Sequence, residues 1–296
     1  AMPVILPFAL MLAPQSYDPE IEAILRRPRQ EKAQPAPAPP PPPVNQSADA
    51  PTDANTPSLP VPPEIAGPFQ ACLDTAIDSP DAGIAAANEW RLKGGGFYAR
   101  HCLGFAYARA ERWAPAMVAF QQAAEEAERA GAMQQSAQLW AQAGNAALAG
   151  GEAAKARDHF DAALARGLPD GLVKGEVQLD RARALVALDD LAGARDSIDA
   201  ALDQAPRDPL GWLLSATLAR RTGEMALAQA HIARAVQLSP DDAAVALEEG
   251  NIAILTDHED IARAAWQRAV RLAPASAEGR AAADNLSRLP AATPVN

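Results

Sequence analysis

The chain has 296 residues, of which 49% are hydrophobic but only 5% aromatic, and its formal net charge at pH 7 is −11. Alanine supplies much of the hydrophobic fraction, which favours closely packed helices over a sheet, because Ala has a high helix propensity and a small side chain. The negative charge and the lack of any Lys/Arg-rich run argue against a nucleic-acid partner, since such a surface needs basic groups to neutralise phosphates.

The first segment, residues 1–15, is apolar. Its core from Pro3 to Ala13 is shorter than the roughly 20 apolar residues of a membrane-spanning helix, but it has the length of a signal-peptide core. A basic leading region is missing, and Pro14 is a poor context for cleavage. Two interpretations stay open: the remnant of an export signal, or a hydrophobic end that docks on the folded part. Membrane association is expected only through this segment, if it is uncleaved.

Residues 16–63 are expected to form a tail rather than a domain. Its first part, Ser16–Arg27, predicts one short helix that is capped by Asp18 and has Pro19 in its first turn. The apolar stripe of this helix and the basic residues that follow are Ile21, Ile24, Leu25, Arg26, Arg27 and Arg29. The segment is either a short docking motif or an unstructured remnant.

Proline dominates the second part of this tail. Thirteen of the 36 residues from Pro28 to Pro63 are proline, including five in a row from Pro39 to Pro43. Such a composition buries too little apolar surface to offset the entropy of ordering. We expect a semi-rigid, extended linker that acts as a spacer.

Three prolines, Pro206, Pro240 and Pro274, follow one another at intervals of 34 residues. Each is preceded by a small, a large apolar and a small residue at steps of four and three, which places all three on one helical face. The triples, including two further ones upstream, are Ala116/Phe120/Ala123, Ala156/Phe160/Ala163, Ala194/Ile198/Ala201, Ala228/Ile232/Ala235 and Ala262/Trp266/Ala269. A fixed period of this length indicates an array of helix-turn-helix units.

The helix before each triple carries its own small residue at a matching place. These residues are Gly104, Gly144, Ala182, Ala216 and Gly250, and Trp140 and Trp212 stand four residues before two of them. On these positions the chain resembles the tetratricopeptide repeat family over 97–276. The resemblance implies an all-α, right-handed solenoid.

The expected domain organisation follows from aligning the chain on this pattern. The five repeats are 97–130, 137–170, 175–208, 209–242 and 243–276, preceded by a degenerate helix pair at 64–96 and followed by a capping helix at 277–289 and a tail at 290–296. The first two repeats depart from the pattern because they lack the terminal proline.

The resemblance also implies a concave groove, lined by the first helix of each unit, that binds a partner peptide or helix. The positions expected to face it are Tyr98, His101, Phe105, Gln142, Asn145, Leu179, Arg183, Leu213, Thr217, Arg220, Glu248, Asn251 and Leu255. For each residue taken singly, the alternative is an ordinary solvated helix face.

Two residue types in this set have chemistry that suits a peptide. Asn145 and Asn251 occupy the place where related peptide-binding arrays hold the peptide backbone, and an amide offers both donors and an acceptor. Arg183 and Arg220 could receive a carboxylate. The lysines that complete the carboxylate clamp of some relatives are absent, so recognition of a C-terminal peptide of that kind is not expected.

No pattern of a catalytic or metal site is present. The four histidines, His101, His159, His231 and His258, fall in different repeats, and no His-Glu-x-x-His or Gly-x-Ser-x-Gly occurs. His159 and His231 occupy the same position of their repeats, which indicates a role in the scaffold. We therefore expect neither enzymatic activity nor a cofactor or metal.

Cys72 and Cys102 are the two cysteines of the chain. They lie on the expected first helices of neighbouring units, at a similar height, so a disulfide between them is geometrically plausible. The alternative is a pair of reduced thiols in a cytosolic protein. A bridge and an export signal would support each other, and together they favour a bacterial periplasm or cell envelope over the cytoplasm.

Three functional hypotheses follow. The first is a protein-binding adaptor that uses the concave groove. The second is a structural subunit of a larger envelope assembly, tethered to a distant partner by its Pro-rich tail. The third, which would need a deep pocket with clustered carboxylates or histidines, is a ligand- or saccharide-binding or processing protein. The identity of the partner, the biological process and the oligomeric state are not predicted.

Overall fold

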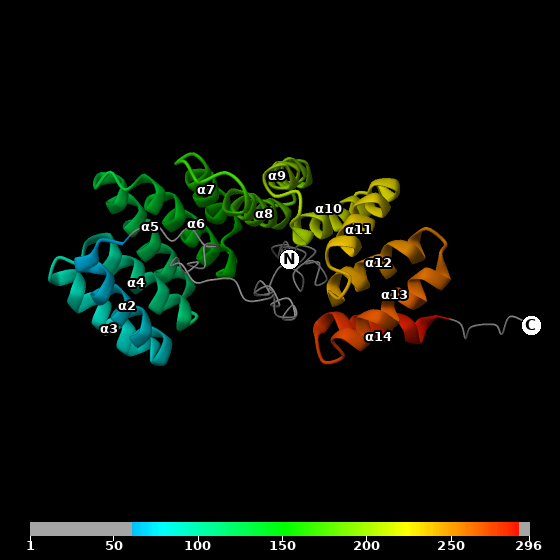
Figure 1. Ribbon diagram of the computed structural model, residues 1–296, viewed down its shortest axis with the longest axis horizontal. Helices are drawn as coiled ribbons and strands as arrows, with labels where there is room; N and C mark the ends of the chain where they lie inside the picture. The colour runs from blue at the N-terminus through cyan, green and yellow to red at the C-terminus, as the bar shows by residue number, and fades with distance from the viewer. Residues whose placement is uncertain (1–60, 290–296) are drawn as a thin grey trace, which may run out of the picture.

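The computed structural model describes residues 61–289, and this part of the chain forms thirteen helices and no strand. The helices are α2 (Pro63–Asp78), α3 (Pro80–Leu92), α4 (Gly96–Arg109), α5 (Trp113–Arg129), α6 (Met133–Ala149), α7 (Ala153–Leu164), α8 (Leu172–Ala187), α9 (Leu191–Gln204), α10 (Pro209–Arg221), α11 (Met225–Leu238), α12 (Ala243–Leu255), α13 (Glu259–Leu272) and α14 (Ala277–Arg288). They stack in chain order into a curved solenoid, with α2 and α14 at its two ends (Figure 1). The all-α prediction is confirmed.

The even-numbered helices form the inner layer of this arc. Each odd-numbered helix from α3 to α13 packs against its neighbours in the chain, whereas α2 also contacts α4, α6 contacts α8, and α12 contacts both α10 and α14. These pairs of inner helices lie side by side, and the even-numbered helices make the concave side of the arc in Figure 1.

The small residues of the repeat pattern allow the two helices of a unit to approach closely. An added Cβ at Gly104, Gly144 or Gly250 would lie 2.6, 2.5 or 2.4 Å from the aromatic ring of the second helix, at Phe120, Phe160 or Trp266 respectively. The expectation that the large residue fills the space opposite the small one is confirmed. Glycine is required at these places because a ring occupies the volume of its missing side chain.

A matched pair of glycine substitutions tests this packing. Gly250→Ala forces the Trp266 ring to move and is expected to lower the free energy of unfolding by about 2 kcal/mol. Gly67→Ala, in α2, adds a methyl group where no atom lies within 4 Å and is expected to raise it by about 0.5 kcal/mol. Urea denaturation of both variants measures the difference, and equal effects would contradict the packing argument.

Several expected boundaries differ from the helix ends. The second and third repeats were expected from 137 and 175, whereas α6 begins at Met133 and α8 at Leu172. The extra residues lengthen the helices instead of forming loops, since α5 and α6 have 17 residues each, whereas α11 and α13 have 14. The expected linker 16–63 also ends earlier, because α2 begins at Pro63, where proline is tolerated in the first helical turn.

The terminal elements follow the expected order. Helices α2 and α3 occupy the region of the degenerate pair, and α14 ends at Arg288 after starting at Ala277. The predictions for residues 1–60, including the signal segment, the short helix and most of the linker, lie outside the described residues, as does the tail 290–296.

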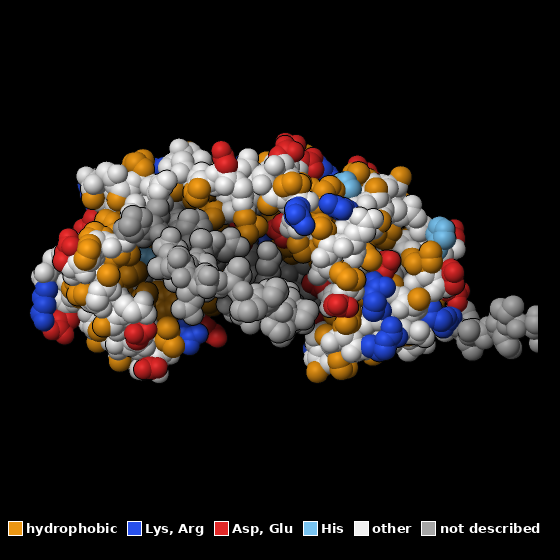
Figure 2. Space-filling view, viewed as in Figure 1, with side chains coloured by type: hydrophobic (Ala, Val, Ile, Leu, Met, Phe, Trp, Pro, Cys, Tyr) orange, Lys and Arg blue, Asp and Glu red, His pale blue; other side chains and the backbone are white. Residues whose placement is uncertain are grey.

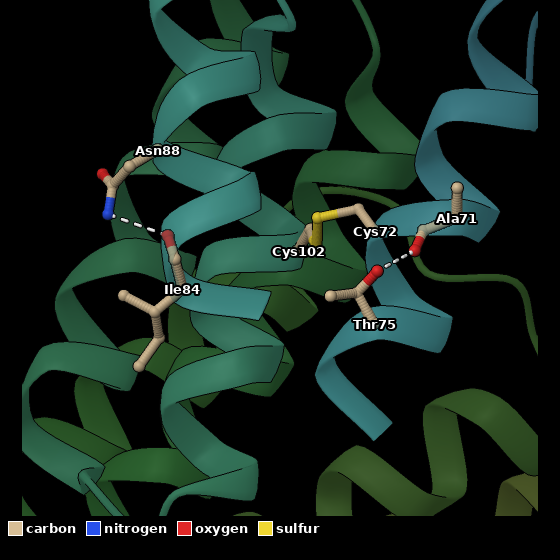
Figure 3. Close-up of a disulfide and its surroundings, with 6 residues drawn as sticks. All are labelled: Ala71, Cys72, Thr75, Ile84, Asn88 and Cys102. Carbon is tan, nitrogen blue, oxygen red and sulfur yellow. Dashed lines mark hydrogen bonds between the residues drawn. A yellow bond between two sulfur atoms is a disulfide. The ribbon is translucent and has the colours of Figure 1, made fainter. Parts of the chain in front are cut away.

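A disulfide joins the first two inner helices. Cys72 of α2 and Cys102 of α4 are bonded, with their Cα atoms 6.2 Å apart and a sequence separation of 30 residues (Figure 3). Both side chains are buried, next to Leu103 and Ala119. The bridge attaches the N-terminal helix pair covalently to the first repeat.

Candidate partner-binding groove

The inner helices carry every residue that was expected to line the groove, but their exposure differs. Asn145 and Leu255 are exposed; Tyr98, His101, Phe105, Gln142, Arg183 and Arg220 are half-buried; Leu179, Leu213, Thr217, Glu248 and Asn251 are buried. The buried group forms the wall beneath the groove surface, and the other eight residues are the ones whose side chains a partner can reach.

Aromatic rings collect at the N-terminal end of the groove. Tyr98 stacks on Phe97 with ring centroids 4.1 Å apart, and it meets Phe69 of α2 edge-on at 5.6 Å. His101 lies between Phe69, at 5.1 Å, and Phe120, at 5.9 Å. These residues hold α2 against α4, so much of their surface serves packing between units.

Burial lowers the pKa of His101 from 6.5 to about 4. The unfolded chain therefore binds more protons than the folded chain between pH 6.5 and 4, and stability falls as the pH falls through this window. Because His101 keeps some solvent contact, we expect a loss of about 2 kcal/mol. Burial lowers the pKa values of His159 and His231 in the same direction.

Urea denaturation at pH 6.5, 5.5 and 4.5 measures this dependence. A His101→Gln variant should lose part of the slope, because an amide does not titrate in this range. A variant whose stability changes with pH as steeply as that of the native chain would contradict the assignment to His101.

The middle of the groove is formed by α8 and α10. Arg183 donates from Nη1 to Asp180 Oδ1 at 3.1 Å, and its Nε, although buried, has no hydrogen-bond partner among the described residues. A small hollow opens beside it between the two helices. Its lining is mostly apolar and consists of Ala182, Arg183, Val186, Ile198, Leu214, Thr217 and Leu218.

A polar ladder crosses the C-terminal part of the groove. Glu248 Oε1 accepts from Arg220 Nε at 2.7 Å, and Glu248 Oε2 accepts from Asn251 Nδ2 at 3.3 Å. Asn251 Oδ1 in turn accepts from Trp266 Nε1 and from Asn285 Nδ2, both at 3.2 Å. Asn251, which the resemblance suggested for holding peptide backbone, thus uses both its donor and its acceptor within the protein.

Asn285 was missed by sequence reasoning, although a signal existed. It follows Asn251 by 34 residues, the repeat period, so α14 continues the array for one more inner helix. The expectation of a terminal capping helix gave no reason to search α14 for groove residues.

In the C-terminal part several carboxylates lie near the first turns of inner helices and several arginines in their last turns, although Lys174 and Arg280 also lie in first turns and Asp189 follows α8. The carboxylates are Glu176, Asp208, Asp242 and Glu278. Asp208 and Asp242 cap α10 and α12 by accepting from Leu210 N at 3.0 Å and Ala244 N at 2.7 Å. The arginines in the last turns of α10 and α14 are Arg220, Arg221 and Arg288.

This placement has a physical cause. Carboxylates are favourable near a helix N-terminus and cations near its C-terminus, because of the helix dipole and the unpaired backbone groups at each end. The N-caps Asp208 and Asp242 and the arginines in the last turn of α10 follow this preference.

Histidines at equivalent positions serve the scaffold. His159 stacks on Trp140 with centroids 5.4 Å apart, and His231 meets Trp212 edge-on at 5.1 Å. Within residues 61–289 no group of three or more His, Cys, Asp or Glu side chains is arranged to hold a metal ion.

The surface of the described part shows no broad basic stripe on the face in Figure 2. Lys and Arg side chains appear there in small separate groups, at the α2–α3 end, over the α10–α11 region and at the α12–α14 end, among acidic and hydrophobic ones. Among the described helices, none combines the length and the hydropathy needed to cross a membrane.

Comparison with known proteins shows similarity in fold alone. No protein-family model and no curated protein sequence matches the chain. The PilF structure from Pseudomonas aeruginosa has a TM-score of 0.59 at 14% identity and covers 75% of this chain and 99% of its own. The structure of PilW, a widely conserved type IV pilus biogenesis factor, has a TM-score of 0.60 at 15% identity, with 74% and 98% covered. The apo form of RapI reaches 0.61 at 11% identity, with 73% and 66% covered.

These likenesses agree with the repeat pattern. The chain has a tetratricopeptide-like helical solenoid fold, in which six inner helices from α4 to α14 present a concave surface within the described residues.

Proposed function

We propose that this chain is a non-catalytic scaffold that binds a peptide or helix of a partner protein in its concave groove. The observation that carries the proposal is the inner layer itself. It presents a row of inner helices whose reachable side chains combine apolar, amide and guanidinium groups, such as Phe105, Asn145 and Arg183. Such a mixture suits the side chains and backbone of a peptide.

The similar structures support the general class. Repeat scaffolds of this fold are usually non-enzymatic. PilW is described as a biogenesis factor, which is a role in assembly and fits an interaction scaffold. The low identity limits this support to the fold, so the partner of PilW is not transferred to this chain.

We further propose that the protein works in an oxidising compartment, namely the bacterial periplasm or cell envelope. The disulfide between Cys72 and Cys102 supports this location, because cytosolic thiols are kept reduced. The interpretation of the apolar segment 1–15 as a remnant of an export signal agrees with this location. Counting free thiols in protein from its native cell tests the location: none is expected, and two would indicate the cytoplasm.

Site-specific photo-crosslinking tests the groove. A photoreactive phenylalanine analogue at Asn145, exposed on inner helix α6, is expected to crosslink a partner protein in the native cell. The same analogue at Val118, which is 43% exposed on outer helix α5, is the matched control and should crosslink at least tenfold less of it. Equal crosslinking from both positions, or none from Asn145, would contradict the proposal that the groove binds the partner.

A further inference from the structure

We propose that the N-terminal face of the groove, formed by α4 and α6, binds this chain's own proline-rich segment Pro35–Pro43. The inference rests on the proposed function, because it takes the concave surface to be one that accepts a peptide, and it adds the identity of one occupant. A partner that uses this face would then have to displace the segment.

The face combines two aromatic rings with two amides. Relative to the small residue of each helix, Tyr98 and Phe105 in α4 occupy the same two places as Gln138 and Asn145 in α6. All four side chains are half-buried or exposed. Helices α4 and α6 both pack on α5, and a hydrogen bond between the side chains of Tyr98 and Gln135 connects them.

Charge is nearly absent from this face. Helix α6 contains no Asp, Glu, Lys or Arg in its 17 residues. Of the charged residues of α4, Arg100 donates to Glu126 of outer helix α5, and Arg109 lies in the last turn. The chain from Ala33 to Ala48 is uncharged as well. A charged ligand would lose hydration here without meeting an opposite charge, whereas this stretch would not.

The amides of Gln138 and Asn145 are available to a peptide backbone. Neither forms a side-chain hydrogen bond within residues 61–289, whereas Asn251 uses both its donor and its acceptor inside the protein. A run of prolines such as Pro39–Pro43 has no backbone N–H, so it presents carbonyl groups that need donors. The two side-chain NH2 groups supply these donors.

The aromatic rings suit proline for a second reason. Grooves that recognise proline-rich peptides are lined by aromatic side chains, on which the flat proline rings pack. Tyr98 and Phe105 keep part of their surface accessible, although Tyr98 also contacts Phe97 and Phe69. Because the proline ring fixes φ near about −65°, consecutive prolines lose little conformational entropy on binding.

The segment lies close to this face along the chain. Residues 44–60 separate it from Val61, and at about 3.1 Å per residue they reach roughly 53 Å. Val61 directly precedes α2, whose Phe69 ring lies 5.6 Å from that of Tyr98. The segment itself is about 28 Å long by the same rise, nearly three times the roughly 10 Å spacing of packed helices. It can therefore contact both α4 and α6.

Photo-crosslinking in the purified full-length protein, without any partner, tests the inference. The photoreactive phenylalanine analogue replaces Gln134, which is exposed and lies one helical turn before Gln138. We expect mass spectrometry to place the crosslink within residues 33–44. The analogue at Val118, on outer helix α5, is the matched control and should give at least tenfold less of this product.

Isosteric variants assign the product to the two amides. Gln138→Glu combined with Asn145→Asp should lower the crosslink yield about tenfold, because donors are lost and charge is introduced. Since neither amide bonds within residues 61–289, Tm should stay at the native value. Gln237→Glu makes the same change at an exposed position of outer helix α11 and should leave the yield unchanged.

A change in the segment provides a test that does not depend on the repeats. Pro39→Asp combined with Pro41→Asp lies outside the helices and should also lower the yield about tenfold, because it adds charge and interrupts the proline run. A yield that survives both double variants would overturn the inference, as would equal yields from Gln134 and Val118.

Mixing isotope-labelled with unlabelled protein separates the possible sources of the segment. A product that joins a labelled chain to an unlabelled one would place the segment on a second copy and overturn docking within one chain. The proposed function has its own readout, the crosslink of a partner at Asn145 in the native cell. A partner crosslink there, without an internal product in the purified protein, would overturn this inference and leave the proposed function standing.

Discussion

Replacing Glu248 by alanine is expected to lower the free energy of unfolding by about 4 kcal/mol, the largest effect of any single substitution proposed for this protein. The Glu248 and Arg220 side chains are 2% and 14% exposed, and the Glu248 carboxylate accepts from both Arg220 and Asn251. Its removal leaves a buried guanidinium without this carboxylate and an amide without its acceptor. Removing one partner of a buried ion pair lowers the free energy of unfolding by more than the net contribution of the intact pair, because the other charge is left buried without its partner.

The neighbouring Glu249 provides the control. It also forms an ion pair, with Arg268 at 2.6 Å, but the two side chains are 24% and 30% exposed. Glu249→Ala is therefore expected to reduce stability by less than about 1 kcal/mol, since solvent screens a partly exposed pair. Urea denaturation of the two variants measures the difference. Similar losses of unfolding free energy in Glu248→Ala and Glu249→Ala would contradict the expectation that the buried Glu248 pair matters more for stability than the partly exposed Glu249 pair.

Breaking the disulfide has the second largest expected effect. A bridge that closes a loop of 30 residues is expected to stabilise the folded chain by about 3.5 kcal/mol in the chain-entropy description. The effect should concentrate in α2 and α3. These two helices form one end of the stack, and both pack on α4. Removal of the bridge should therefore first release Pro63–Leu92 and leave the C-terminal repeats folded.

Hydrogen–deuterium exchange with and without reductant locates this loss. Amides of α2 and α3 should exchange about 100-fold faster or more after reduction, while those of α10 to α13 keep their rates. The double variant Cys72→Ala/Cys102→Ala should show fast exchange in both conditions and no response to reductant. An unchanged exchange rate of α2 and α3 in the reduced native protein would contradict the expected stabilisation of these helices by the disulfide.

The repeat architecture could be predicted because its determinants are local. The spacing of prolines and the small–large–small triples lie within one helix pair, so each unit can be recognised from its own residues, as Gly144 facing Phe160 illustrates. Helix lengths were less predictable. Nothing local distinguishes an insertion that extends a helix, as before Ser136 in α6, from one that forms a loop.

The residues expected to face the groove all lie on inner helices, but their exposure could not be predicted from the sequence. Asn145 and Asn251 occupy the same place in their repeats, yet Asn145 is exposed and Asn251 is 8% exposed. The large residue of the second helix is Phe160 in one unit and Trp266 in the other, and only the indole has an N–H that donates to the amide. Asn285 from the next inner helix adds the second donor.

The sequence by itself determined the helical repeat, the pairing of helices and the identity of the inner face, because period and side-chain size act within a unit. Only the tertiary structure decided which inner-face side chains form contacts within the protein and which remain accessible to a partner. That outcome depends on groups one repeat away, such as Arg220 reaching Glu248 of the next unit.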